Sequence, residues 1–342
     1  MKNWRTLLAS VSLIAFASGA SATELNIYAW SGEVPQEIVD DFAKETGITV
    51  TFDTYDSNET MMAKLSAGAS GYDLIEPSQY TVQVLAKQGL LKELDHAKIP
   101  NLGNLGAPFK DVSYDPGQKW SVPYIWGTTG FAYNEDCVKT PPTSWKALWD
   151  PQYEGRIYML DNMLAAYIAG LQVNGFKAGT TTPAEIEKAT QSLIEQKKVL
   201  GGYNSTNFGD LVASGEACIV QGWNGSIAQV MATNPKVKYV VPDEGGSMWI
   251  DGFAIPSSAK NVEEAYKFID YIMRPDVAAK AANLSKSATV IDKAKELLPK
   301  EVVENAAIYP AEDKLMKADF ILDVGDATKL YQDGWTKVKT AQ

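Results

Sequence analysis

The sequence predicts an α/β protein divided into two lobes. Strand-like and helix-like segments alternate along the first 80 residues, and a similar alternation returns after residue 145. The chain has 342 residues, and chains longer than roughly 250 to 300 residues usually divide into domains. We therefore expect two lobes, each a mixed, mostly parallel sheet flanked by helices.

Residues 1–22 are typical of a cleavable secretory signal peptide. Lys2 and Arg5 precede an apolar run over residues 7–16, and the small residues Ala20-Ser21-Ala22 come just before Thr23. A membrane anchor needs roughly 20 apolar residues, and this run is shorter. No cysteine follows that could carry a lipid. We expect a free, soluble protein after export.

The first lobe begins with a strand, because residues 24–29 alternate polar and apolar side chains before the turn Trp30-Ser31-Gly32. Ile38, Val39 and Phe42 recur at helical spacing, which predicts a helix from residue 35 that closes at Gly47. The further elements expected in this lobe are a strand at 49–54, a helix at 59–65 and a short strand at 73–76.

Two apolar segments, 122–131 and 249–255, are interpreted as crossings between the lobes. They make each lobe discontinuous, and we expect residues 23–128 plus 250–296 in lobe 1 and residues 129–249 plus 297–342 in lobe 2. The other elements expected are helices at 145–153, 165–171, 183–197, 263–273 and 328–339, with strands at 217–222 and 239–241.

The formal charge of −11 argues against nucleic acid and anionic lipid as partners. It fits a cationic ligand, although solubility alone would explain it. His96 is the only histidine and lies in a polar segment, so the sequence gives little support for histidine-based catalysis or for a zinc site. No nucleophile elbow, phosphate loop or calcium loop is present. We expect no enzyme activity, no cofactor and no metal.

Cys137 and Cys218 are the two cysteines, and both would enter an oxidising compartment. Their separation in sequence does not decide whether they pair. Cys218 lies in an apolar stretch, where a free thiol behaves as a small buried hydrophobe. A disulfide and two free thiols both remain open.

Trp30, Trp126, Trp223 and Trp249 each stand beside Ser, Gly or Asp at the expected end of a strand. Ligands of open α/β sheets gather at such ends, and indole faces hold alkyl chains and attract ammonium groups. Asp251 could complete an ammonium site. Core packing is the competing interpretation for any one of these tryptophans.

The chain resembles the periplasmic spermidine/putrescine-binding proteins of polyamine ABC transporters. The likeness runs from Leu25 to Lys339, and the segments that carry it are Tyr55 to Thr60, Tyr72 to Ile75, Ser121 to Gly127, Trp223 to Ser226 and Arg274 to Ala278. It implies a two-lobed periplasmic binding protein fold of type II, with the ligand between lobes that close by a hinge motion. It also implies Trp30, Ser31, Ser78, Tyr80, Trp223, Trp249 and Asp251 as ligand contacts.

Other positions depart from the family pattern. Two acids that hold an amine in the family align with Asn162 and Ala165, a tyrosine aligns with Ser287 beside Lys286, an aromatic residue with Glu33, and a glutamine with Ile321. Losing carboxylates at one end makes a second amine there harder to hold. Glu33 could replace the missing charge, and Lys286, if it points inward, would attract a carboxylate.

We therefore expect a periplasmic solute-binding protein that captures a polyamine-like ligand for an inner-membrane ABC permease and acts as a monomer. One alternative is a mono-aminated ligand such as an amino-acid derivative or opine. Another is a partner that reports a ligand to a membrane sensor. The expected ligand-binding residues are Trp30, Ser31, Glu33, Ser78, Tyr80, Asn162, Trp223, Trp249, Asp251 and Ser287.

Overall fold

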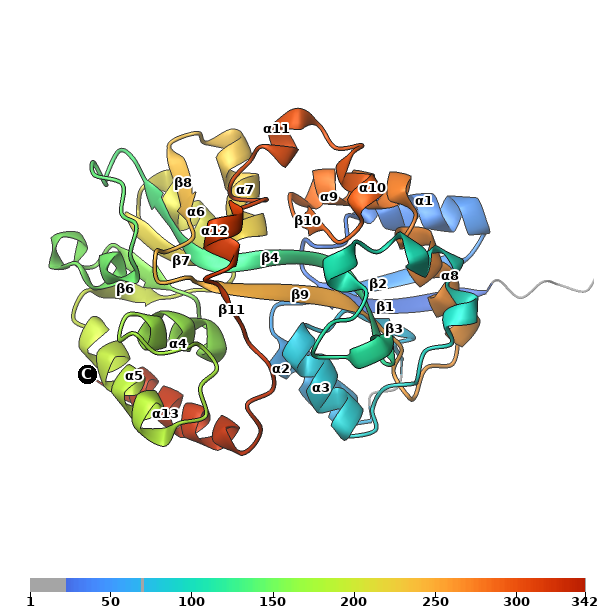
Figure 1. Ribbon diagram of the computed structural model, residues 1–342, viewed down its shortest axis with the longest axis horizontal. Coiled ribbons are helices and arrows are strands. Elements are labelled where there is room, and N and C mark those ends of the chain that lie inside the picture. Colours follow the sequence, from blue (N-terminus) through green and yellow to red (C-terminus); the bar gives the residue numbers. More distant parts are fainter. Residues whose placement is uncertain (1–22, 69–70, 342) are drawn as a thin grey trace, which may run out of the picture.

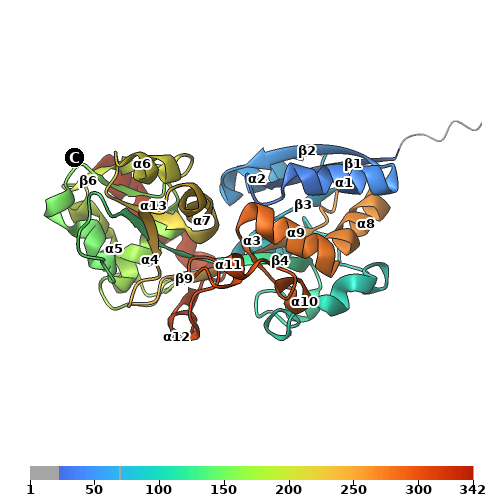
Figure 2. The ribbon, with the colours of Figure 1, turned by 90° about the horizontal axis from the view of Figure 1, so that it is seen from above.

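Two α/β lobes lie side by side and are joined by two long strands, β4 (Ser121–Asn134) and β9 (Ser247–Ala254) (Figure 1, Figure 2). The computed structural model describes residues 23–68 and 71–341, so the expected signal peptide lies outside the described residues. Within those ranges, no helix is long and apolar enough to cross a membrane, and eleven strands form one continuous sheet.

The first lobe is built on three parallel strands beside the crossing strands. β1 lies between β2 and β3, and β3 pairs antiparallel with β9. The strands of this lobe are β1 (Glu24–Trp30), β2 (Thr49–Tyr55), β3 (Leu74–Ile75) and β10 (Ala288–Thr289), and its helices are α1 (Gln36–Thr46), α2 (Asn58–Ser66), α3 (Gln79–Lys87), α8 (Val262–Ile272), α9 (Pro275–Ser285) and α10 (Asp292–Lys295).

Helix α1 forms where the spacing of its apolar residues predicts it. Ile38, Val39 and Phe42 are buried on its inner face, as their helical spacing predicts. The helix ends at Gly47, which adopts a left-handed conformation with φ of 73°. The expected helix at 263–273 stops before Pro275, and that proline occupies the first turn of α9, which the sequence analysis did not anticipate.

The second lobe has a parallel core of its own. β5 pairs in parallel with both β6 and β7, while β7 and β8 run antiparallel to β4. The strands are β5 (Ile157–Met159), β6 (Leu200–Tyr203), β7 (Ile219–Trp223) and β8 (Val237–Val240), and the helices are α4 (Met163–Gln172), α5 (Pro183–Gln196), α6 (Phe208–Ser214), α7 (Asn224–Thr233) and α13 (Thr328–Thr340).

The helix expected at 145–153 is wrong, because this segment forms two short 3₁₀ turns, Trp145–Trp149 and Pro151–Tyr153. Proline disfavours helical geometry at the preceding residue. Asp150 is accordingly extended, with ψ of 115°, and its side chain accepts a hydrogen bond from the next turn at Gln152. The proline therefore divides what the apolar spacing presented as one helix.

Strands β4 and β9 pair antiparallel from Ser121 opposite Ala254 to Thr129 opposite Ser247. Every residue of β4 is buried, which explains the uninterrupted apolar texture of its sequence. The register shifts between Pro123 and Ile125, at a residue that has no N–H for the ladder. Both crossings run through the interior as strands, so bending between the lobes has to occur within a hydrogen-bonded ribbon.

The chain passes between the lobes a third time near its end. Leu298, Val302 and Ile308 pack in the hydrophobic core of the first lobe, although the sequence division assigned residues 297–342 to the second. Strand β11 (Asp319–Phe320) then pairs with β9, and Tyr331 lies in the second core. We propose that lobe 1 extends to about residue 308, with the short helices α11 (Lys300–Val303) and α12 (Glu312–Leu315) flanking the passage.

Cys137 and Cys218 are joined in a disulfide, with their Cα atoms 5.5 Å apart. The bond links the loop after β4 to the residue before β7, so it fixes two neighbouring strands of the second lobe at their shared end. Cys218 is fully buried. The apolar surroundings that suggested a free thiol therefore contain half of a disulfide.

Candidate ligand-binding cleft

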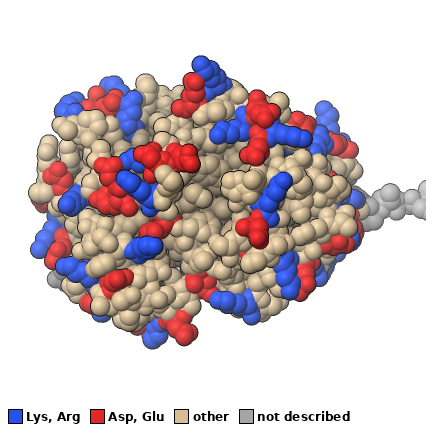
Figure 3. All heavy atoms as spheres, viewed as in Figure 1, with Lys and Arg blue, Asp and Glu red and all other residues tan. Residues whose placement is uncertain are grey.

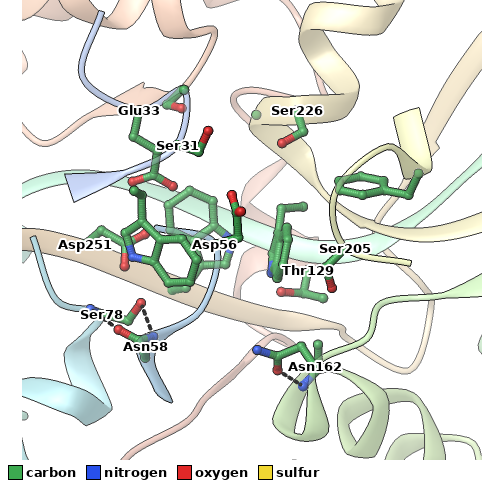
Figure 4. Close-up of a pocket in the computed structure, with 18 of the residues that line it drawn as sticks. Ser31, Glu33, Asp56, Asn58, Ser78, Thr129, Asn162, Ser205, Ser226 and Asp251 are labelled. Carbon is green, nitrogen blue, oxygen red and sulfur yellow. Dashed lines mark hydrogen bonds between the residues drawn. The ribbon is translucent and has the colours of Figure 1, made fainter. Parts of the chain in front are cut away.

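A cavity of about 370 Å³ lies between the two lobes (Figure 4). Its volume falls within the range of small-molecule sites. All of the expected ligand-binding residues line it, namely Trp30, Ser31, Glu33, Ser78, Tyr80, Asn162, Trp223, Trp249, Asp251 and Ser287. Residues that are more than 250 positions apart in the sequence therefore line the same cavity.

Parallel strand ends bring the first-lobe residues together. β1 and β3 are neighbours and run in the same direction, so their carboxyl ends reach the same edge of the sheet. Trp30 is the last residue of β1, Ser31 and Glu33 come just after it, and Ser78 and Tyr80 follow β3 at the start of α3. Positions two apart on a strand point to one face, which places Trp249 and Asp251 of β9 in the same cavity.

Three tryptophans shape the apolar part of the cleft. The rings of Trp30 and Trp223, from opposite lobes, have centroids 6.3 Å apart at an interplanar angle of 56°. Trp249 packs directly against Gly127 of β4, where a Cβ atom would come within 2.2 Å of the indole. Asn224 Oδ1 lies at 2.1 Å from the same point, so only a glycine leaves room for both the Trp249 ring and the Asn224 side chain.

Trp126, the fourth tryptophan singled out from the sequence, does not line the cavity. It is buried among aromatic side chains of the first lobe, and its indole N–H donates to the carbonyl of Thr289 at 3.1 Å. Its position on β4 places it on the face opposite to that of Gly127, the next residue. For this tryptophan the core-packing interpretation is the correct one.

Asp251 stands at the first-lobe end of the cleft and is only 4% exposed. Its Oδ1 has no hydrogen-bond partner among the described residues. Ser78 and the Trp30 indole lie near enough to favour the ionised carboxylate, but burial dominates and raises the pKa of Asp251 to about 7. A buried carboxyl with an open acceptor is a place where a cationic donor would be strongly held.

A hydrogen-bond network around Asn58 holds the neighbouring polar residues in place. The Asn58 side-chain amide donates to Ser78 Oγ at 3.0 Å and to the Tyr80 hydroxyl at 2.8 Å. Figure 4 shows Asn58 and Ser78 together at the Asp251 end of the cleft. Asn58 is buried, so the network is protected from water and Ser78 and Tyr80 are presented in fixed positions.

The charge lining the cleft has one sign. Carboxyl groups come from Glu33, Asp56, Asp210 and Asp251, and the described residues that line the cavity include no lysine, arginine or histidine. Lys286 does not line it, and its ammonium donates to Asn283 at 3.1 Å. On the face of the molecule that Figure 3 shows, basic and acidic side chains are instead interspersed over both lobes. The one-signed lining is thus a local property of the cleft.

The second-lobe end of the cleft is polar but uncharged near α4. Asn162 Oδ1 accepts a hydrogen bond from the Ala165 N–H at 2.9 Å, so Asn162 caps the helix (Figure 4). Ser205 also faces this end, and its hydroxyl has no partner among the described residues. Ile321 lines the cavity where the resembling family has a glutamine. The second-lobe side near α4 therefore lacks the carboxyl group that Asp251 supplies to the first-lobe end, and the acid of the described lining on this lobe is Asp210 of α6.

Several lining residues were not identified from the sequence. Asp56 follows β2, and Asp210 lies on α6, on opposite sides of the cleft. Thr129 of β4 and Gln229 of α7 also contribute. Asp56 carried a usable signal, because it follows a strand parallel to β1 and hence reaches the same sheet edge. For Asp210 no such signal exists, since α6 was not predicted.

Among residues 23–68 and 71–341, no group of three or more histidine, cysteine or acidic side chains has a geometry that could hold a metal ion. The residues that line the cleft offer aromatic faces, hydroxyl groups and carboxylates. Such a set can hold an alkyl chain by burial and a cation by charge.

Comparison with known proteins agrees with this chemistry. Residues 37–311 match the family described as bacterial extracellular solute-binding protein. The spermidine/putrescine-binding periplasmic protein of Salmonella typhimurium is 36% identical over 348 residues, covering 100% of both chains, and the putrescine-binding periplasmic protein of Escherichia coli is 32% identical, covering 100% of this chain and 99% of its own. A putative spermidine/putrescine ABC transporter structure from Listeria monocytogenes has a TM-score of 0.89 at 32% identity, covering 94% of this chain and 100% of its own.

Proposed function

The chain belongs to the family of bacterial extracellular solute-binding proteins, and from this premise we propose that it captures a polyamine, putrescine-like or spermidine-like, for an ABC importer. The observation that carries the proposal is the one-signed lining of the cleft, with four carboxyl groups and three tryptophans. The Trp rings bury the methylene chain, and Asp251 binds one ammonium group by a charge-assisted hydrogen bond.

The roles of the lining residues follow from their positions. Ser31, Ser78 and Tyr80 offer hydroxyl groups beside Asp251, and Glu33 adds a second carboxyl at the same end. Asn162 and Ser287 supply neutral polar groups to the ligand from other sides of the cleft. Ligand contacts to both lobes favour the closed arrangement, in which a membrane permease recognises the loaded protein.

A mono-aminated ligand is a second candidate, because Asn162 and Ala165 provide no charge for a second amine. A carboxylate on such a ligand would, however, find no basic partner in the described lining, since Lys286 is engaged with Asn283. Agmatine, whose two ends differ, and 4-aminobutyrate, which carries a carboxylate, separate these cases. The proposal favours agmatine over 4-aminobutyrate.

Calorimetric titration with putrescine, spermidine, agmatine and 4-aminobutyrate tests the function. At least one of the first three is expected to bind more tightly than roughly 1 mM, with the anionic-ended compound weaker than all of them. The proposal fails if none of the amines binds in that range. Binding to 4-aminobutyrate alone would instead support the mono-aminated alternative.

Export, assembly state and partner are parts of the same proposal. The relatives are periplasmic, and cleavage after residue 22 would release this chain there as a monomer. Mass spectrometry of the exported protein gives the first residue, and light scattering gives the mass in solution. Reconstitution with the permease encoded nearest to this gene, compared with any neighbouring membrane sensor, distinguishes transport from signalling.

A further inference from the structure

Glu76 is a fully buried carboxyl that lies behind the cleft without lining it. Its Oε2 accepts a hydrogen bond from the backbone N–H of Trp30 at 3.1 Å, while its Oε1 has no partner among the described residues. Glu76 is not among the residues that the sequence predicts to bind the ligand. A buried carboxylate with an unused oxygen is costly unless it gains a proton or a cation.

Two further buried carboxyl oxygens lie beside it. Glu33 Oε2 and Asp251 Oδ1 are also sealed from solvent without a hydrogen-bond partner among the described residues. The three carboxyls come from three segments, the turns after β1 and β3 and the strand β9. None of the ion pairs found among the described residues includes Glu33, Glu76 or Asp251.

The other ionisable groups that face this cluster are neutral tyrosines. The Tyr55 hydroxyl of β2 donates to the carbonyl of Glu76, and the Tyr124 hydroxyl of β4 donates to the carbonyl of Glu33 at 3.2 Å. Tyr80 of α3 and Tyr114, before β4, also lie within electrostatic range of Asp251. Burial raises the pKa of each of these four hydroxyls, so they stay uncharged and do not balance the carboxyls.

The carboxyl groups of Glu33 and Glu76 lie close enough to interact, and each has an oxygen, Glu33 Oε2 and Glu76 Oε1, without a hydrogen-bond partner among the described residues. Ionised carboxylates only accept hydrogen bonds, so neither of these oxygens can satisfy the other unless one of the two groups carries a proton. Burial, the largest cause, together with the charge of Asp251 raises the pKa of both glutamates well above the usual value. The pair therefore retains a proton at a pH at which an exposed glutamate has lost it.

We propose that Glu76 is a positioning residue that makes ligand capture proton-linked. In the ligand-free protein, Glu33 and Glu76 hold a proton between them next to Asp251. When an ammonium group of the ligand reaches Asp251, its charge favours the ionised form of the pair, and the proton leaves to solvent. One cation enters the cleft and up to one proton departs, so the charge buried there changes little.

This linkage gives affinity a definite dependence on pH. Because binding releases a proton, the association constant rises with pH wherever the pair is still protonated in the free protein. The slope of its logarithm equals the number of protons released, up to about one per pH unit. The inference rests on the proposed function for the class of ligand, while the retained proton is a property of the ligand-free protein and can be tested alone.

Two measurements separate these parts. Calorimetry with putrescine at pH 7, in buffers of different ionisation enthalpy, gives the protons released per ligand bound. The wild type is expected to release between about 0.3 and 1 proton, Glu76→Gln less, and Glu33→Gln/Glu76→Gln less still, down to the share that Asp251 itself releases because its pKa is about 7. The matched control Glu59→Gln, an exposed acid on α2, should release as much as the wild type.

Infrared spectra of the ligand-free protein provide the second measurement. The carbonyl stretch of a protonated carboxyl is expected at neutral pH in the wild type and reduced in Glu76→Gln. Equal proton release by the wild type and the double variant, or no protonated carboxyl in the free wild type, would overturn the proposal. If putrescine fails to bind while the protonated carboxyl is present, the ligand class is wrong and the retained proton stands.

Discussion

Replacing Asp251 by asparagine removes one negative charge from the first-lobe end of the cleft while keeping the size of the side chain. Truncating one partner of a buried, hydrogen-bonded charge pair costs about 2 to 5 kcal/mol. Asp251 is 4% exposed, so water screens its attraction to an ammonium group little. Glu33 lines the same end and retains part of the attraction. We therefore expect about 2 to 3 kcal/mol, which is roughly a 30- to 150-fold weaker association.

The assay is calorimetric titration with putrescine at pH 7.5, accompanied by thermal melts that verify folding. Asp56→Asn is the matched control, because it removes the same charge from an exposed position on the same cavity. Water and salt screen an exposed carboxylate, so this variant should bind less than about fivefold more weakly. If folded Asp251→Asn also bound within fivefold of the wild type, or if Asp56→Asn lost as much, Asp251 would not be the amine partner.

Three further predictions concern stability as well as binding. Gly127→Ala places a Cβ atom 2.1 Å from Asn224 Oδ1 and 2.2 Å from the Trp249 indole, so it should lower the free energy of unfolding by about 1 to 3 kcal/mol in urea and weaken putrescine binding; unchanged values would show that both side chains can move aside. Replacing Cys137 and Cys218 by serine opens an 81-residue separation and should cost up to about 4 kcal/mol of unfolding free energy, with affinity retained, since neither residue lines the cavity. Ligand-free protein should lose stability as the pH rises from about 4 to about 7, because Asp251 ionises near pH 7 in the fold and near pH 4 when unfolded; thermal melts of Asp251→Asn should lack that component, which is at most about 4 kcal/mol.

Local patterns predicted the elements whose apolar faces are regular. The spacing of Ile38, Val39 and Phe42 and the left-handed Gly47 specify α1 almost completely. Helices α6 and α7 were missed because short helices with many small residues carry weak periodicity. At Asp150 a helix was predicted that does not form. The prediction followed the apolar spacing and neglected the effect of the proline at position 151 on the preceding residue.

The cleft was predictable as a set of residues but not as an electrostatic environment. The family resemblance predicted Trp30, Trp223 and Asp251 as ligand contacts, and in the structure all three line one cavity. Glu76 could not be predicted as part of the site, because the sequence around the short strand β3 does not show which side chains pack against the residue that follows it. The buried carboxyl cluster depends on how β1, β3 and β9 meet, which only the assembled sheet reveals.

The passage of the chain through both lobes three times has a consequence for how the molecule acquires its structure. Ile75 of β3 pairs with Ala254 of β9, 179 positions later in the chain (254 − 75), and the first core also takes in Ile308. Contacts of such long range make folding slow, because the intervening chain must be ordered first. A nascent chain emerging from the ribosome cannot complete its first lobe until nearly all of it has been made. Delayed folding of this kind leaves the first lobe incomplete, and its edge strands unpaired, during most of the chain's synthesis.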